Sequence, residues 1–228
     1  MNSIAEFQSF LKMARLNREI WVSEKIDGSN GCIFITPISK DSQDPFCLAY
    51  WYGPDASTWG LYAGSRNRWL QPGKSDNYGF AAWVLANVEE LKKLGPGRHF
   101  GEWWGQGIQR NYGLTERRFS LFNVARWVSS LYSDPTRPGV LRVEKDEEHG
   151  EILKPGPESL FVVPVLWRGQ FHSRHIENAL ENLRENGSYA APGFMQPEGI
   201  VVFHTAAGSC FKVTLVGDDK RKSDLTSL

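Results

Sequence analysis

A lysine in a short polar turn is the residue of this chain best suited to act as a nucleophile. Lys25 lies in the polar segment 23–30, which has an apolar, strand-like run on each side. A lysine at the mouth of such a turn can be desolvated and surrounded by fixed polar groups, which lowers the pKa of the amine and makes it reactive. Because Lys-x-Asp-Gly sequences are also common in ordinary solvated turns, Lys25 alone establishes no chemistry.

Five segments after Lys25 carry further residues that can bind a nucleotide or neutralise charge. They are, in chain order, an arginine turn with Arg66 and Arg68, Glu102 on an apolar run, the alternating segment 118–124 with Phe122, Glu198 before the apolar run 199–203, and Lys212 in the last strand-like run. Each of them has a plain structural alternative as a surface charge, a core residue or, for Glu102, a salt-bridged strand residue. Glu102 is the hardest to dismiss, because an acid beside Trp103 and Trp104 is costly to bury without a partner. We therefore expect Glu102 to face a cleft.

The hydrophobic pattern indicates which elements hold these segments. Apolar residues at helical spacing predict helices over 4–15, 80–94 and 174–186, the last of them capped by Ser173. Runs of aromatic and β-branched residues predict strands near 19–24, 31–36, 46–52, 60–65, 98–104, 119–127, 161–167, 199–204 and 210–215. Residues 129–160 are rich in serine, proline, glycine and charge, which predicts a surface excursion with one short strand at 139–143.

The order of these elements predicts an α+β fold. Strands outnumber helices and mostly follow one another directly, which favours mainly antiparallel sheets packed with flanking helices. The 228 residues suit a single domain over 1–228, with 216–228 as a tail. The sequence contains no GxxxxGK[ST] loop, which argues against a P-loop NTPase.

Composition narrows the class of protein further. The 26 Lys+Arg and 26 Asp+Glu residues give a net charge of zero, so no global basic field indicates a nucleic-acid partner, although a local groove can still be basic. The three widely spaced cysteines fit neither a disulfide framework nor a zinc site, and indicate free thiols in a reducing compartment. No run approaches the roughly 20 apolar residues of a membrane span, and the N-terminus lacks the apolar core of a signal peptide. These features predict a cytoplasmic protein.

Taken in order, the polar segments resemble those of the covalent nucleotidyltransferases, which include ATP-dependent RNA ligases, DNA ligases and mRNA-capping guanylyltransferases. The similarity runs from residue 21 to about 215 and covers the lysine turn, the arginine turn, Gly-Glu, an aromatic strand, Glu-Gly-Ile-Val-Val and a late lysine. Glu24 directly before the lysine and Asn30 five residues after it are most similar to the RNA ligases. The resemblance implies the fold of a ligase adenylation domain, with a nucleotide pocket between sheets.

The resemblance also implies an activity and a set of roles. Lys25 would attack the α-phosphorus of ATP, form a lysyl–AMP intermediate and expel pyrophosphate; AMP would then pass to a 5′-phosphate RNA end, and a 3′-hydroxyl would displace it. Lys212 would be the second catalytic residue. The nucleotide would be bound by Glu24, Asp27, Asn30, Arg66, Glu102, Phe122, Glu198 and Lys212, with Phe122 stacked on adenine and Glu102 accepting from ribose hydroxyls. Glu198 would hold Mg²⁺ or Mn²⁺, which prefer hard oxygen ligands.

RNA ends are the implied substrate, and a basic strip beside the pocket would hold them. The arginines that we expect to contact RNA phosphates are Arg68, Arg110, Arg117 and Arg118. The chain departs from the superfamily in its last motif, which commonly has two lysines separated by one residue. Here either Thr214 takes the second place, or Lys212 does and Cys210 stands in the first.

Several alternatives stay open from the sequence. DNA ligases and capping enzymes normally carry an oligonucleotide-binding barrel after the last motif, and we expect none here because few residues follow Leu215. A minimal DNA ligase, another polynucleotide ligase or guanylyltransferase, and a non-catalytic nucleotide- or RNA-binding module are the competing hypotheses. The joint presence of Lys25, Glu102, Glu198 and Lys212 argues against the last of these. A ligase this compact also leaves a role for an accessory protein in recognising nicks.

Overall fold

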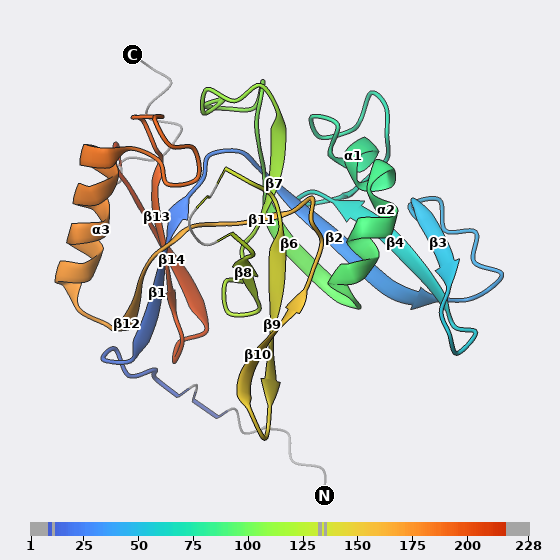
Figure 1. Ribbon diagram of the computed structural model, residues 1–228, viewed down its shortest axis with the longest axis horizontal. Coiled ribbons are helices and arrows are strands. Elements are labelled where there is room, and N and C mark those ends of the chain that lie inside the picture. Colours follow the sequence, from blue (N-terminus) through green and yellow to red (C-terminus); the bar gives the residue numbers. More distant parts are fainter. Residues whose placement is uncertain (1–8, 11, 132–133, 135, 218–228) are drawn as a thin grey trace, which may run out of the picture.

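The structure, a computed structural model, describes residues 9–10, 12–131, 134 and 136–217. It is built from three sheets with a few helices packed against them (Figure 1). The strands are β1 (Glu19–Lys25), β2 (Ser29–Ile38), β3 (Ala49–Tyr52), β4 (Thr58–Gly64), β5 (Trp69–Leu70), β6 (Gly97–Gly105), β7 (Arg117–Leu121), β8 (Trp127–Ser129), β9 (Val140–Asp146), β10 (Gly150–Pro155), β11 (Phe161–Val162), β12 (Val165–Gln170), β13 (Gly199–His204) and β14 (Ser209–Thr214). The helices are α1 (Phe80–Ala86), α2 (Val88–Leu91), the short 3₁₀ helix η1 (Lys92–Leu94) and α3 (Ser173–Asn186).

The four-stranded sheet carries the strand that ends in Lys25. Its order is β12-β1-β13-β14, and all its neighbouring strands are antiparallel. Side chains of β1 alternate between buried and partly exposed positions, with Ile20 and Val22 in a core that includes Leu183 of α3. Because successive side chains of a strand point to opposite faces, Lys25 lies on the face turned away from α3.

The seven-stranded sheet has its main core on one face, while Trp104 of β6 belongs to a separate buried cluster. Its order is β11-β7-β6-β2-β4-β3, with β5 paired to β4, and its strands pair antiparallel except for β11 and β7. Odd-numbered residues of β2, such as Ile33, pack with Phe80 and Leu91 from the helical region and with Phe119 of β7. Even-numbered residues of β2 therefore point to the opposite face. The predicted α+β fold with mainly antiparallel sheets is confirmed.

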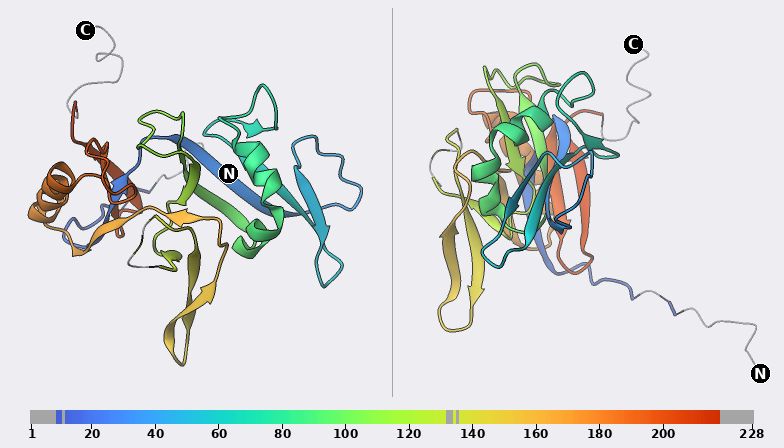
Figure 2. Two further views of the ribbon diagram at one scale, coloured as in Figure 1. Left: turned by 45° about the horizontal axis from the view of Figure 1, so that its top comes forward. Right: turned by 90° about the vertical axis from the view of Figure 1, so that its right-hand side faces the viewer.

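The segment predicted as a surface excursion forms most of a third sheet, of order β10-β9-β8. The β9–β10 hairpin projects from the rest of the molecule (Figure 1, Figure 2). Only one strand was predicted here, at 139–143, whereas the structure has two, β9 and β10. Val140 at the start of β9 is buried in the core with Trp127, but β10 is mostly exposed and lacks an apolar run, so its pairing with β9 gives no signal in the sequence. The charged run begins in β9, where Glu144 forms an ion pair with Lys154 of β10 at 2.6 Å.

Of the predicted helices, 174–186 is confirmed and 80–94 is not continuous. Helix 174–186 is confirmed as α3, but its N-cap is His172, whose side chain accepts from the Arg174 amide, and not Ser173. The predicted helix 80–94 is broken at Asn87, whose side-chain amide donates to the carbonyl of Trp83 and so competes with the regular helical pattern. None of the helices in the described part of the chain is long and apolar enough to cross a membrane.

The predicted helix 4–15 falls largely outside the described residues. Its described positions, 9–10 and 12–15, are not helical. Phe10 is 98% exposed and Met13 is 96% exposed, so these two described apolar side chains have no packing partner within the described part of the chain. A short helix without a packing partner is marginal in water, which explains why helical spacing alone was misleading here.

Candidate active site

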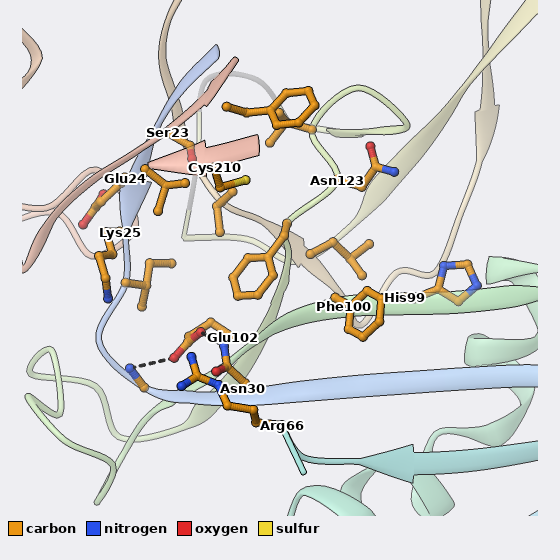
Figure 3. Close-up of a pocket in the computed structure, with 18 of the residues that line it drawn as sticks. Ser23, Glu24, Lys25, Asn30, Arg66, His99, Phe100, Glu102, Asn123 and Cys210 are labelled. Carbon is orange, nitrogen blue, oxygen red and sulfur yellow. Dashed lines mark hydrogen bonds between the residues drawn. The ribbon is translucent and has the colours of Figure 1, made fainter. Parts of the chain in front are cut away.

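A cavity of about 1150 Å³ is lined by residues of β1, β13 and β14 from one sheet and of β2 and β6 from the other (Figure 3). Of the residues predicted for a nucleotide or RNA site, those that line it are Glu24, Lys25, Asp27, Asn30, Arg66, Arg68, Glu102, Phe122 and Lys212. Residues that are far apart in the sequence thus line the same cavity. Glu198, Arg110, Arg117 and Arg118 do not line it.

Strand register arranges the four-stranded side of the cavity in rows. Lys25 of β1 is opposite Gly199 of β13, which is in turn opposite Thr214 of β14. A Cβ atom on Gly199 would lie 2.1 Å from the carbonyl oxygen of Val213, at a φ of +155°, so only glycine fits this position. Lys212 lies two residues before Thr214, on the same face of β14. Lys212 therefore supplies a cation on this wall of the cavity, whether it takes the first or the second place of the last motif.

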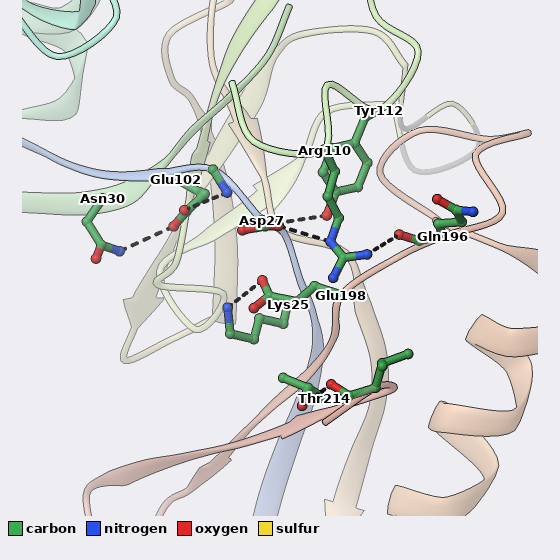
Figure 4. A network of polar contacts seen from close by, with 11 residues as sticks. Lys25, Asp27, Asn30, Glu102, Arg110, Tyr112, Gln196, Glu198 and Thr214 are labelled. Carbon is green, nitrogen blue, oxygen red and sulfur yellow. Dashed lines mark hydrogen bonds and ion pairs between the residues drawn. The ribbon is translucent and has the colours of Figure 1, made fainter. Parts of the chain in front are cut away.

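The amine of Lys25 is held by Glu198. Its Nζ atom lies 2.5 Å from Oε2 of Glu198, and the two side chains are 24% and 7% exposed (Figure 4). Glu198 directly precedes the residue that pairs with Lys25, so the register of β1 and β13 brings the acid to the lysine. The pair leaves the lysine reachable from the cavity while neutralising its charge.

Glu102 faces the cavity, as the sequence predicts. Its carboxylate accepts from the amide of Gly28 at 3.0 Å and from the side-chain amide of Asn30 at 3.2 Å. Burial raises the pKa of Glu102 to about 7; the charge of Lys25 opposes this rise, and those of Glu198 and Asp27 add to it. Glu102 is therefore electrostatically coupled to the lysine and to both neighbouring acids.

This raised pKa predicts a measurable pH dependence of stability. The folded state holds the Glu102 proton more tightly than the unfolded chain, so the stability due to this group is present below about pH 4.5 and is lost as the pH rises through about 7. Between pH 4.5 and 8 the wild type should lose on the order of 3 kcal/mol of unfolding free energy relative to Glu102→Gln. Denaturant unfolding of both proteins at each pH measures the difference. Parallel curves for the two proteins would contradict the prediction.

Asp27 helps to fix the lysine turn to the rest of the domain. Its carboxylate accepts from Nε of Arg110 at 2.9 Å, and its backbone amide donates to the hydroxyl of Tyr112 at 2.8 Å (Figure 4). Arg110 also donates to the carbonyl oxygen of Gln196, two residues before Glu198. Arg110, predicted as an RNA contact, thus connects the turn to the segment that carries Glu198.

Glu24 is directed away from Lys25. It is 1% exposed, and its carboxylate accepts three hydrogen bonds, from the hydroxyl of Ser188 and from the amides of Tyr189 and Ala190, at 2.6, 2.8 and 2.9 Å. Burial raises the pKa of Glu24, while these hydrogen bonds oppose the rise. Its carboxylate is thus fully engaged with the segment after α3, and the prediction that it binds the nucleotide receives no support from its contacts.

The chain matches a known protein family. Residues 18–214 match the family model for RNA ligase. The chain belongs to the RNA ligase family. No curated protein matches the chain significantly.

Solved structures of an RNA ligase from Naegleria gruberi share the fold of this family member. One mutant without ligand matches with a TM-score of 0.51 and 16% identity, covering 91% of this chain and 52% of that one. Another mutant, with ATP and Mn, matches with a TM-score of 0.50 and 17% identity, covering 87% and 50%. The chain thus spans about half the length of the RNA ligases it matches.

Two of the arginines that were predicted to contact RNA, Arg117 and Arg118, contact other parts of the protein. Arg118 is buried, forms an ion pair with Glu116 at 2.8 Å and lies over the ring of Phe161. Arg117 donates to the carbonyl of Tyr78 at 2.6 Å, outside the cavity. Because its guanidinium is buried and paired, the contacts of Arg118 give no support to the prediction that it binds RNA.

Sequence reasoning also missed residues that shape the site. Tyr112 lies in an irregular segment and has a φ of +53°, so no periodicity marks it, although its hydroxyl orients the lysine turn. Trp103 and Trp104, which follow Glu102 on β6, are both buried. Phe100, two residues before Glu102 on the same face of β6, is exposed instead.

Proposed function

We propose that this domain is an ATP-dependent RNA ligase that adenylates itself on Lys25, transfers AMP to a 5′-phosphate RNA end and seals that end to a 3′-hydroxyl. The observation that supports this most is the position of Lys25 on the cavity wall, paired with Glu198 and coupled to Glu102. The Naegleria gruberi structure determined with ATP and Mn is consistent with ATP and a divalent metal as cofactors.

The residues around Lys25 suit the parts of ATP in turn. The ring of Phe122, partly exposed to the cavity, is available to stack on adenine. Glu102 would accept hydrogen bonds from ribose hydroxyls, an acceptor role that ionisation above about pH 7 completes. Arg66 and Lys212, both exposed on the cavity wall, would neutralise phosphate oxygens.

Attack on phosphorus requires the amine of Lys25 without its proton. The contact with Glu198 stabilises the charged ammonium form, so this pair must open or exchange its proton before the amine becomes a nucleophile. The new N–P bond then forms as the bond to pyrophosphate breaks, with the leaving group in line. Glu198 would thus control when Lys25 can react, in addition to holding the metal ion.

The donor set near Lys25 fits a metal that is held largely through substrate. Among the described residues no group of three or more His, Cys, Asp or Glu side chains is arranged to hold a metal ion. Mg²⁺ and Mn²⁺ can bind through one carboxylate, waters and nucleotide phosphates, and Glu198 would be that carboxylate. When bound, the ion would neutralise charge on the phosphates during transfer.

The test of this proposal is covalent labelling. Incubation with α-labelled ATP and Mg²⁺ should put acid-labile label on the protein, and mass analysis should find one AMP on the peptide that contains Lys25. Label taken only from GTP would indicate a guanylyltransferase. Offering matched RNA and DNA nicks and single-stranded 5′-phosphorylated RNA to the adenylated protein then separates the ligase classes, and joining of DNA alone would remove the RNA assignment.

Glu198→Ala should impair self-adenylation far more than folding. We expect the labelling rate to fall about 100-fold or more, because an electrostatic partner of the reacting groups is lost. The unfolding free energy should change by only about 1 kcal/mol, since water can solvate the partly exposed Lys25 that remains. Labelling kinetics and thermal unfolding measure the two effects. A large fall in melting temperature with little loss of labelling would identify Glu198 as a structural acid.

A further inference from the structure

One face of the seven-stranded sheet carries aromatic rings and an arginine that the proposed adenylation chemistry does not use. We call it the aromatic face and define it by Phe34, Tyr62, Trp69, Arg98 and Phe100. It is the face of β2 and β6 opposite the helix-covered core, since Ile33 and Phe119 belong to that core. Phe100 is 55% exposed, and Arg98 is exposed as well; Phe34 and Trp69 are partly exposed, and Tyr62 is buried.

The rings and the guanidinium of this face form a stacked group. The ring centroids of Phe34 and Trp69 lie 5.8 Å apart with planes only 15° from parallel. The Arg98 guanidinium carbon lies 4.0 Å from the Phe34 ring centroid and 5.3 Å from that of Trp69. The flat face of Arg98 thus packs against the rings. A guanidinium has five N–H donors, so the hydrogen bond between Arg98 and the Cys32 thiol leaves others for an anion.

The aromatic face is continuous with the candidate active site. In the pairing of β2 with β6, Asn30 is opposite Glu102, and Phe34 is opposite Arg98. Phe34 is four residues along β2 from Asn30, a distance of about 13 Å at the usual rise of a strand. Phe100 and Arg98 also line the cavity, and Figure 3 shows the ring of Phe100 there. A chain leaving the site in this direction would pass over Phe100 and then Arg98.

Two further arginines, Arg66 and Arg68, lie near the path from the active site to the aromatic face. Arg66 and Arg68 lie on the turn between β4 and β5, beside Trp69, and both line the cavity. Within the part of the chain that the structure describes, no ion pair to Arg66, Arg68 or Arg98 is present. Asp44, hydrogen-bonded to the hydroxyl of Tyr62, is an acid beside this face. Arg68 donates a hydrogen bond to the carbonyl oxygen of Ser75 at 2.8 Å. On a chain of zero net charge, three arginines that form no ion pair within the described residues, next to partly exposed rings, indicate an anionic, aromatic ligand.

We propose that the aromatic face binds a single-stranded segment of the RNA substrate next to its reacting end, an inference that rests on the proposed function. Base stacking on exposed rings and phosphate contacts from arginine are the usual means by which proteins hold single strands without reading their sequence. In a duplex the bases are already stacked on one another, so this face should prefer an unpaired strand.

Binding can be measured without any chemistry. The probe is a 5′-phosphorylated 12-mer of uridine with a dye at its 3′ end, titrated with protein and followed by fluorescence anisotropy in the absence of ATP and metal. We expect Arg98→Ala to weaken binding about tenfold and Phe100→Ala to weaken it by a similar factor. Arg168→Ala is the matched control, because Arg168 also stacks on a ring at 4.0 Å, that of Trp21, but on the other sheet. It should bind as the wild type does.

Each outcome decides for or against the proposal. Weaker binding by Arg98→Ala and Phe100→Ala with an unchanged Arg168→Ala supports it; if Arg98→Ala unfolds, Phe100→Ala decides, because its exposed ring contributes little to the fold. Wild-type affinity in both variants overturns it, as does equally tight binding of a blunt RNA duplex. A wild type that takes label from ATP while both variants bind RNA normally refutes this inference alone. Absence of label in the wild type refutes the proposed function, whatever the binding result.

Discussion

Lys25→Ala should take no label from α-labelled ATP, the largest effect expected of any single substitution in this chain. The amine is the only atom of this position that can form the N–P bond, and the alanine methyl group offers no replacement. The fold should persist, because Lys25 is partly exposed and lies at the end of β1, outside the apolar core behind that strand. Autoradiography of the protein after denaturing electrophoresis measures the label, and melting temperature reports the fold.

Lys25→Arg is the matched control for charge. Arginine can still pair with Glu198, but its guanidinium does not lose its proton at ordinary pH and is a poor nucleophile. It should therefore be as inactive as alanine, while restoring the ion pair. Label that persists on Lys25→Ala, or that mass analysis locates on Lys212, would show that the nucleophile is misassigned.

The parts of the site that could be predicted from sequence are those that local pattern determines. Glu102 was expected to face a cleft because an acid among tryptophans is costly to bury unpaired, and the structure gives it two hydrogen-bond donors and an open cavity. Strand 199–204 was predicted with the bounds that it has, because its apolar run begins at a glycine and is long enough to be unambiguous. Strand alternation and burial cost are local properties.

The parts that could not be predicted depend on tertiary contacts. Whether an arginine is a free cation or a buried partner is decided by residues far away in sequence: Arg118 meets Phe161, and Arg110 meets Asp27. Arg98 gave no signal at all, because its stacking partners Phe34 and Trp69 come from other strands. The RNA contacts were therefore the least predictable part of the site.

Glu24 illustrates a signal that was present but was not used. Its position beside Lys25 suggested a shared role, yet side chains alternate along a strand, so neighbours in β1 must face opposite ways. Lys25 faces the cavity and Glu24 faces the segment that follows α3. The position of Glu24 next to Lys25 in the sequence suggested that it contacts the nucleotide. The alternation of side chains along β1 indicates instead that Glu24 positions the strand.

Glu24→Ala should be the most destabilising substitution in the site. It leaves the hydroxyl of Ser188 and two backbone amides without their charged acceptor, in a place that water does not reach. The expected loss is about 3 kcal/mol or more, which corresponds to a fall in melting temperature on the order of 10 °C. Ser188→Ala removes one of the three hydrogen bonds to Glu24 and the hydrogen bond from the Ala191 amide to the Ser188 hydroxyl. It should cost less, about 2 kcal/mol, and serves as the graded control.

The same substitution should also slow self-adenylation, for a reason separate from stability. The segment that Glu24 holds at Ser188 continues to Glu198, so loosening its start lets the partner of Lys25 move. Labelling by Glu24→Ala, measured well below its melting temperature, should therefore fall with little change in the KM for ATP, because the carboxylate makes no contact in the nucleotide part of the cavity. A normal melting temperature with a strongly raised KM would mean instead that Glu24 binds the nucleotide directly, as its place in the motif first suggested.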